Sequence, residues 1–208
     1  TLIRDAIRHA VEVRPVDLAK SSWDCTLEND ETGERPPALR LGMRYVNGLG
    51  YHAKLALQRS WTEGGSFTSV EDVCLRSGLK SKDLERLAMA GAFASFLPGR
   101  RRALWMVLSI LRNRFDLPLM RKLKELQTAP EMVPEGIVPM DELEEIIADY
   151  RTTNLSTGRH PMTFYRQWAD ERGMYAANQL TWLRDGDRVS TAGGVIVRQR
   201  PETAKGFV

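Results

Sequence analysis

The chain has 208 residues, of which 42% are hydrophobic and 27% charged, a composition that excludes disorder as the main state. Thirty basic residues against 27 acidic ones give a net charge of +3, and the longest nearly unbroken apolar run, residues 103–111, is too short to cross a membrane. Two distant cysteines and three scattered histidines argue against a disulfide framework and a zinc site and favour a cytoplasmic protein. Because the first residue is Thr rather than Met, we expect a piece of a longer protein.

The N-terminal part is predicted to contain one helix and short β elements. Apolar residues at helical spacing predict a helix over residues 1–11. Residues 11–16 alternate as in a strand, which Pro15 limits to a short or edge strand. Residues 29–37 read as a polar turn segment, and the alternation over residues 39–45 predicts a half-exposed strand.

Four helices are predicted next, over residues 50–61, 68–76, 80–90 and 99–113. The second begins with a capping box in residues 68–71 and ends just before Gly78. The fourth is apolar almost all round, which predicts that it is the central buried helix of the bundle.

The C-terminal part is predicted to be less regular. Four prolines mark residues 116–139 as a linker, residues 140–150 form an acidic amphipathic helix, and a further helix begins at Pro161 and runs to about residue 172. Residues 185–187 form a turn. Residues 188–200 predict a long strand that two glycines interrupt, residues 201–206 a turn, and residues 207–208 the start of the next strand.

Charge is distributed in zones along the chain. Between residues 98 and 127 there are eight basic residues and two acids, whereas residues 129–150 hold seven acids and no base. Residues 40–60 and 188–208 are also predominantly basic. Such zones are compatible with a polyanion bound by selected faces, but charge alone favours solvated surfaces on which charges cluster by chance.

The strongest local motif is Val-Asn-Gly-Leu-Gly at residues 46–50, directly before the first helix of the bundle. Gly48, Leu49 and Gly50 would let backbone amides approach a ligand, and the helix N-terminus beside His52 and Lys54 favours an anion. This is the helix-hairpin-helix pattern, which grips DNA phosphates without reading bases. A tight turn between packed elements explains the motif equally well. For Gly50 we expect either a backbone geometry that a β-carbon makes costly or a close approach to phosphate.

A second candidate combines the turn at residues 90–93 with Arg100, Arg101 and Arg102, which open the fourth helix. Three cations at a helix N-terminus oppose its dipole and cost ~0.3–1 kcal/mol each if exposed. A bound phosphate would remove this conflict; a solvated basic loop is the alternative. Two basic turns close together in the sequence favour a tandem DNA-binding unit.

No residue pattern in the chain predicts a catalytic centre. Asp185 and Asp187 lie in a turn without a third carboxylate nearby in the sequence, so we expect a structural role rather than metal binding. His160, before Pro161, is interpreted as a capping or packing residue. The sequence therefore predicts no catalytic residue and no metal ligand.

Motifs along the whole chain add up to a resemblance. Residues 149–162 contain Asp-Tyr-Arg-Thr-Thr, then Leu-Ser and Gly-Arg-His-Pro-Met, and residues 195–206 contain Val-Ile-Val-Arg-Gln-Arg-Pro and Thr-Ala-Lys-Gly. The first set resembles the joint between the helix-hairpin-helix and OB regions of bacterial C-family DNA polymerases, the DNA polymerase III alpha subunit and its relatives. The second set resembles the opening of the OB domain in the error-prone, damage-inducible branch. Residues 2–17 resemble the end of the fingers region, whereas Asn154 and Glu202 stand where glycine is expected.

Pattern and resemblance together predict a mainly α fold. It would be a tandem helix-hairpin-helix bundle with short β elements in the N-terminal part and a truncated OB-type β-hairpin at the C-terminus. The implied division is the end of the fingers (1–37), a DNA-binding domain (38–115), a linker with connecting helices (116–175) and the start of an OB domain (176–208).

The resemblance implies the DNA-binding segment of an error-prone DNA-directed DNA polymerase, a nucleotidyltransferase acting in DNA repair and in replication across damage (translesion synthesis). Its magnesium would be held by acids outside this chain, which itself would carry no cofactor. Duplex DNA would be bound at the two hairpins, single-stranded template near Arg198, Arg200 and Lys205, and other repair or mutagenesis proteins elsewhere, without a membrane. The alternatives are the same segment of the replicative alpha subunit, or a non-catalytic interaction module that docks repair proteins through its acidic helix and linker.

Overall fold

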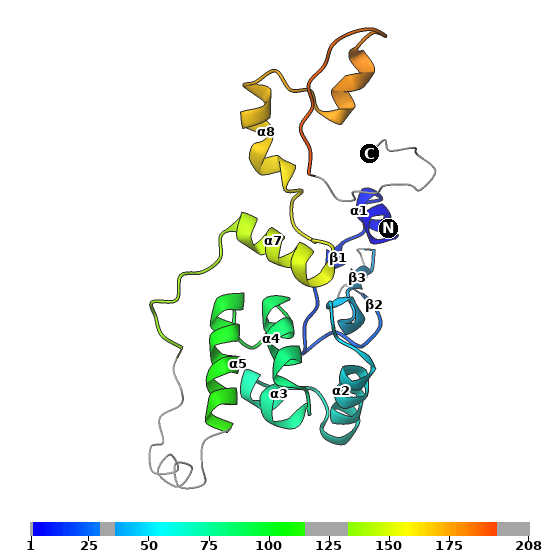
Figure 1. Cartoon of the computed structure of the whole chain (residues 1–208). Coiled ribbons are helices and arrows are strands. Elements are labelled where there is room, and N and C mark those ends of the chain that lie inside the picture. Colours follow the sequence, from blue (N-terminus) through cyan, green and yellow to red (C-terminus); the bar gives the residue numbers. More distant parts are fainter. Residues whose placement is uncertain (1, 30–35, 115–132, 195–208) are drawn as a thin grey trace, which may run out of the picture. The chain divides into compact units, whose positions relative to one another are not determined.

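The computed structural model describes residues 2–29, 36–114 and 133–194. The chain divides into two compact units, residues 1–157 and residues 158–208. As the sequence predicts, it is mainly helical, with short β elements in its N-terminal part (Figure 1). Among the described residues, none of the helices is both long and apolar enough to span a bilayer.

A small sheet follows helix α1 (Leu2–Arg8) in the first unit. Its strands are β1 (Val13–Arg14), β2 (Thr26–Glu28) and β3 (Ala38–Arg40), in the order β1-β3-β2. β1 runs parallel to β3, with Val13 opposite Leu39, and β2 runs antiparallel to β3, with Leu27 opposite Leu39. β1 is therefore an edge strand, as predicted from Pro15, whereas β2 was not predicted.

The strand predicted over residues 39–45 is wrong in extent. β3 ends at Arg40, and Met43–Tyr45 form the 3-10 helix η1. Arg40 is only 6% exposed, because its guanidinium donates to both carboxylate oxygens of Glu28 at 2.7 and 2.9 Å and to the Pro15 carbonyl at 2.9 Å. A buried but fully paired arginine thus occupies a position that the alternating pattern assigned to solvent.

The bundle consists of α2 (Tyr51–Gly64), α3 (Val70–Arg76), α4 (Ser81–Met89) and α5 (Arg100–Arg114), and α7 (Glu142–Thr153) lies across one end of the α4–α5 pair (Figure 1). Ser69 caps α3 by accepting a hydrogen bond from the Asp72 amide at 3.0 Å. The Asp72 carboxylate in turn accepts one from the Thr68 amide at 3.0 Å. The cap predicted at residues 68–71 therefore begins one residue later.

One hydrophobic core joins the sheet to the bundle. Its fully buried side chains include Leu18, Met43, Leu57, Leu87, Phe93 and Val107. The boundary predicted between residues 37 and 38 runs through this core, so the segments on either side of it form one structural unit.

Helix α5 is not the central buried helix that its composition predicted. Ala103 and Val107 are buried on the side that packs against α3 and α4, whereas Leu108 is 46% exposed. Leu104, Met106 and Ile110 are partly buried against the same core, so within the part of the chain that the structure describes α5 is half-buried rather than fully buried.

The second unit contains α8 (Met162–Asp170), with Pro161 at its N-cap, and the 3-10 helix η2 (Ala177–Trp182). The predicted turn is present: Gly186 has a φ of +92°, and the Arg184 amide donates to the Asp187 carboxylate at 2.8 Å. Of the strand predicted over residues 188–200, the described part holds only an isolated bridge between Thr191 and Tyr175. The rest of that strand, residues 201–208, most of the predicted linker and most of the 29–37 turn lie outside the described residues.

Candidate nucleic-acid interface

The first hairpin loop, residues 46–50, connects η1 to α2. Leu49 is 9% exposed and anchors the loop in the core, while Gly48 and Gly50 on either side of it are exposed. Gly50 is the N-cap of α2; it has no side chain to cap the helix, and the first turn of α2 carries no acid. Both α3 and α7, by contrast, begin with a side-chain cap and acidic residues. The first amides of α2 therefore have no side-chain cap, which leaves them available to an external anion.

The two glycines of this loop differ in their roles. Gly50 has φ −95° and ψ −171°, and an added β-carbon would meet nothing within 4 Å, so the expectation of a costly backbone geometry is wrong. Gly48 instead has a φ of +81°, in the left-handed region that favours glycine. The close approach of Gly50 to a phosphate remains a prediction.

Helix α2 buries the apolar residues Ala53 and Leu57, as predicted. Ala53 and Leu57 are 3% and 0% exposed, whereas His52 is exposed and Lys54 half-buried. Gly48, Gly50, His52 and Lys54 are thus the candidate residues of the loop and the following turn that remain exposed or half-exposed. We call these four residues the first hairpin surface.

Arg86, on α4, adds a cation to this surface that the sequence did not predict. Its Nη1 donates to the Gly48 carbonyl at 3.1 Å and to the Asp83 carboxylate at 2.9 Å, and its side chain is 43% exposed. A β-carbon on Gly48 would lie 2.8 Å from the guanidinium carbon of Arg86. The positive φ therefore favours glycine at position 48, and a β-carbon there would also displace the end of the Arg86 side chain.

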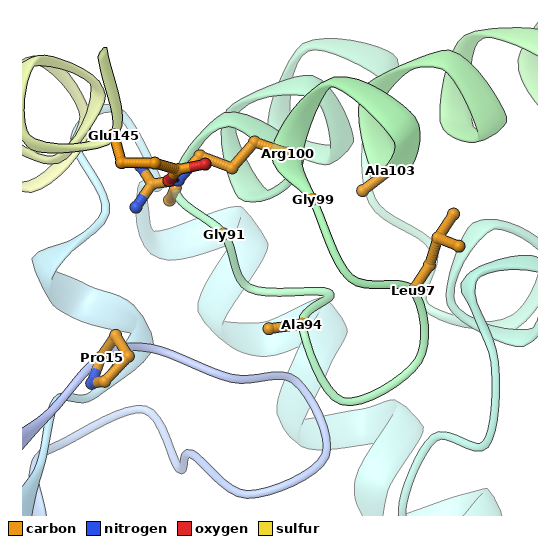
Figure 2. A pocket seen from close by; sticks show the side chains of 9 residues that line it. Pro15, Gly91, Ala94, Leu97, Gly99, Arg100, Ala103 and Glu145 are labelled. Atoms are coloured by element: carbon orange, nitrogen blue, oxygen red, sulfur yellow. Dashed lines mark ion pairs between the residues drawn. The ribbon is translucent and has the colours of Figure 1, made fainter. Parts of the chain in front are cut away.

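The second hairpin loop, residues 90–99, connects α4 to α5. Ala92 and Phe93 are fully buried, and the loop is tied to the N-terminal segment by hydrogen bonds from the Leu18 amide to the Ala92 carbonyl at 2.8 Å and from the Ser95 hydroxyl to the Asp17 carboxylate at 2.7 Å. Figure 2 shows the small pocket beside this loop; its lining is mostly apolar, with Arg100 and Glu145 at one side. These contacts fit a structural role for the loop.

Two of the three arginines at the start of α5 bind α7. Arg100 forms ion pairs with Glu145 at 2.5 Å and with Asp149, donates to the Met89 carbonyl at 2.9 Å, and has a side chain only 11% exposed. Arg101 pairs with Glu144 at 2.7 Å. The positive charges of these arginines oppose the dipole of α5, and the sequence suggested that a phosphate would offset them. In the structure, carboxylates of α7 offset the charges of Arg100 and Arg101.

Of the four remaining candidate DNA-binding residues, the structure describes one. Arg102 is exposed at the start of α5. Arg198, Arg200 and Lys205 lie outside the described residues. Within the described ranges, no three His, Cys, Asp or Glu side chains are grouped so that they could hold a metal ion.

Comparison with known proteins identifies both the motif and its relatives. Residues 10–103 match the family model described as "Helix-hairpin-helix motif". The whole chain is 40% identical to an error-prone DNA polymerase of Caulobacter vibrioides, covering 100% of this chain and 20% of that protein. It is 37% identical to that of Methylococcus capsulatus (99% and 20%) and 40% identical to that of Mesorhizobium japonicum (96% and 19%).

The chain thus spans about a fifth of the length of the curated relatives that it matches. Over essentially all of its residues it is homologous to a segment of error-prone DNA polymerases, and it contains the helix-hairpin-helix motif. Both findings confirm the resemblance to the C-family polymerases.

Proposed function

We propose that the chain is the DNA-binding segment of an error-prone DNA-directed DNA polymerase and that it holds duplex DNA by its phosphates. The observation that carries the proposal is the open N-terminus of α2 behind the Gly-Leu-Gly loop, within a region that matches a helix-hairpin-helix motif. Similarity to error-prone DNA polymerases over the whole chain supports the parent activity.

The first hairpin surface suits a phosphate for three reasons. The loop glycines permit close backbone approach, the first amides of α2 have no partner within the helix, and its dipole favours negative charge. Lys54 lies one turn into the helix, and Arg86 brings a second cation to the loop. These groups contact a phosphate without reading a base, so binding is independent of sequence.

The finer parts of the proposal concern the whole polymerase. It would act in replication across damage and in repair, in the cytoplasm, with magnesium bound by carboxylates outside this chain. Single-stranded template would lie near the basic residues between 188 and 205, and other repair proteins would be its partners. No metal-dependent step is assigned to the residues of this chain.

The test is the salt dependence of duplex binding by the chain and its Lys54→Ala variant. We expect weak binding to two duplexes of unrelated sequence, with log affinity falling by ~0.9 per log unit of salt for each phosphate neutralised. Lys54→Ala should weaken binding to both duplexes equally and reduce this slope by about one.

Lys80→Ala is the matched control, because it removes the same charge from the exposed N-cap of α4, outside the loop. It should leave the slope unchanged. Equal affinity at low and high salt would overturn the proposal. If Lys80→Ala weakens binding as much as Lys54→Ala, binding depends on the overall positive charge rather than on the first hairpin surface, and the proposal also fails.

A further inference from the structure

We infer that α7 joins the first hairpin loop to the start of α5 and that Asn154, just beyond its C-terminal end, positions the first loop for phosphate binding. This inference rests on the proposed function, because it concerns the geometry of the first hairpin surface. The acidic helix is then a positioning element of the DNA interface rather than a docking site for other proteins.

Hydrogen bonds connect the C-terminal end of α7 to the first hairpin loop. The Asn47 amide donates to the Thr152 carbonyl at 2.6 Å, and the Asn47 side chain donates to the Arg151 carbonyl at 3.2 Å. Carbonyls in the last turn of a helix have no amide donor within the helix, so a hydrogen-bond donor from outside stabilises them. Asn47 supplies two such donors, next to Gly48.

Asn154 completes this contact from the other side. Its side-chain amide donates to the Asn47 side-chain oxygen at 2.8 Å. Its backbone has φ 58° and ψ 13°, the left-handed conformation that ends many helices and that glycine and asparagine adopt most readily. The family pattern predicted glycine at this position; asparagine keeps the same backbone and adds a side chain that reaches the hairpin loop.

α7 is also fixed to the start of α5, directly after the second hairpin loop. Glu144 and Glu145 pair with Arg101 and Arg100, and Asp149 binds Arg100 as well. A helix of 12 residues is about 18 Å long. α7 therefore spans from the start of α5 to the first hairpin loop and holds these two segments in one arrangement.

Asn154→Gly tests the inference, because glycine keeps the left-handed backbone and removes only the side-chain contact. We expect the melting temperature to stay within about 2 °C of the parent. Duplex affinity should fall roughly three- to tenfold, with a smaller salt slope as phosphate contact is lost. Asn47→Ala removes this contact and also the hydrogen bond to the Arg151 carbonyl, so it should weaken binding at least as much. The double variant should lose no more than Asn47→Ala alone, because the contact with Asn154 is already broken in that variant.

Asn178→Ala, an exposed asparagine in the second unit, is the control and should bind like the parent. If Lys54→Ala weakens binding and Asn154→Gly does not, the positioning role is wrong and the proposed function stands. If neither variant changes affinity or slope, the DNA site lies elsewhere, and the proposed function of this surface fails together with the inference. If the loss of affinity in Asn154→Gly follows a matching fall in melting temperature, Asn154 is only structural, and the inference is likewise overturned.

Discussion

Alanine at Gly48 and at Gly50 should separate folding from DNA binding. At Gly48, a φ of +81° costs alanine about 1–2 kcal/mol. The new β-carbon would lie 2.8 Å from the Arg86 guanidinium, so that side chain must withdraw from the Gly48 carbonyl, which costs about 0.5–1.5 kcal/mol more. Gly48→Ala should therefore lower the free energy of unfolding by roughly 2 kcal/mol.

Gly50→Ala should leave stability almost unchanged. Its backbone is extended, and the added methyl group would meet open space. The weaker capping by alanine, at most about 1 kcal/mol, is offset by about 0.4–1 kcal/mol from the reduced freedom of the unfolded chain. Duplex affinity should nevertheless fall several-fold, because the methyl group occupies the approach to the first amides of α2.

Urea unfolding followed by circular dichroism measures the first effect, and fluorescence anisotropy of a labelled duplex measures the second. Gly136→Ala is the matched control: this glycine is also exposed and has open space around it, but it lies outside both loops. The reasoning is refuted if Gly50→Ala destabilises the fold as much as Gly48→Ala, or if it leaves duplex affinity at the parent value.

Two further predictions concern ion pairs. Arg100→Ala should destabilise the chain by about 3 kcal/mol, because it leaves the mostly buried carboxylate of Asp149 without its cation and with the Ser156 hydroxyl as a neutral donor; a loss of duplex affinity at unchanged unfolding free energy would instead show that Arg100 binds DNA. The hydrogen bond from Arg40, then that from Arg14, lowers the pKa of Glu28 from 4.5 to about 2, so this group stabilises the fold above pH 4.5 and loses its effect as the pH falls toward 2. Glu28→Gln should remove on the order of 2–3 kcal/mol at neutral pH and flatten the stability profile between pH 4.5 and 2, and a profile that keeps its slope in urea titrations would contradict this assignment.

Local patterns predicted the helices well. The spacing of Ala53 and Leu57 gave both the existence of α2 and the face that it buries, and Pro161 marked the start of α8. These features depend on neighbours within one or two turns, which a single sequence displays directly.

Contacts between distant segments were not predictable in the same way. Arg86 and Gly48 are 38 residues apart, and Asn154 and Asn47 are 107 apart. The basic zone near Arg100 and the acidic zone of residues 129–150 appeared to face different partners, yet they pair with each other across α5 and α7. Charge runs show that opposite charges are present but not which of them fold together.

The most direct test of DNA binding at the first hairpin is to follow backbone amide resonances while a short duplex is added to the isotope-labelled chain at low salt. The proposed interface predicts that the largest shifts fall on the amides of residues 48–54, that they reverse on addition of salt, and that they are reduced in Lys54→Ala. If the resonances of these amides do not change and the largest shifts fall on other residues, the loop is only a structural turn.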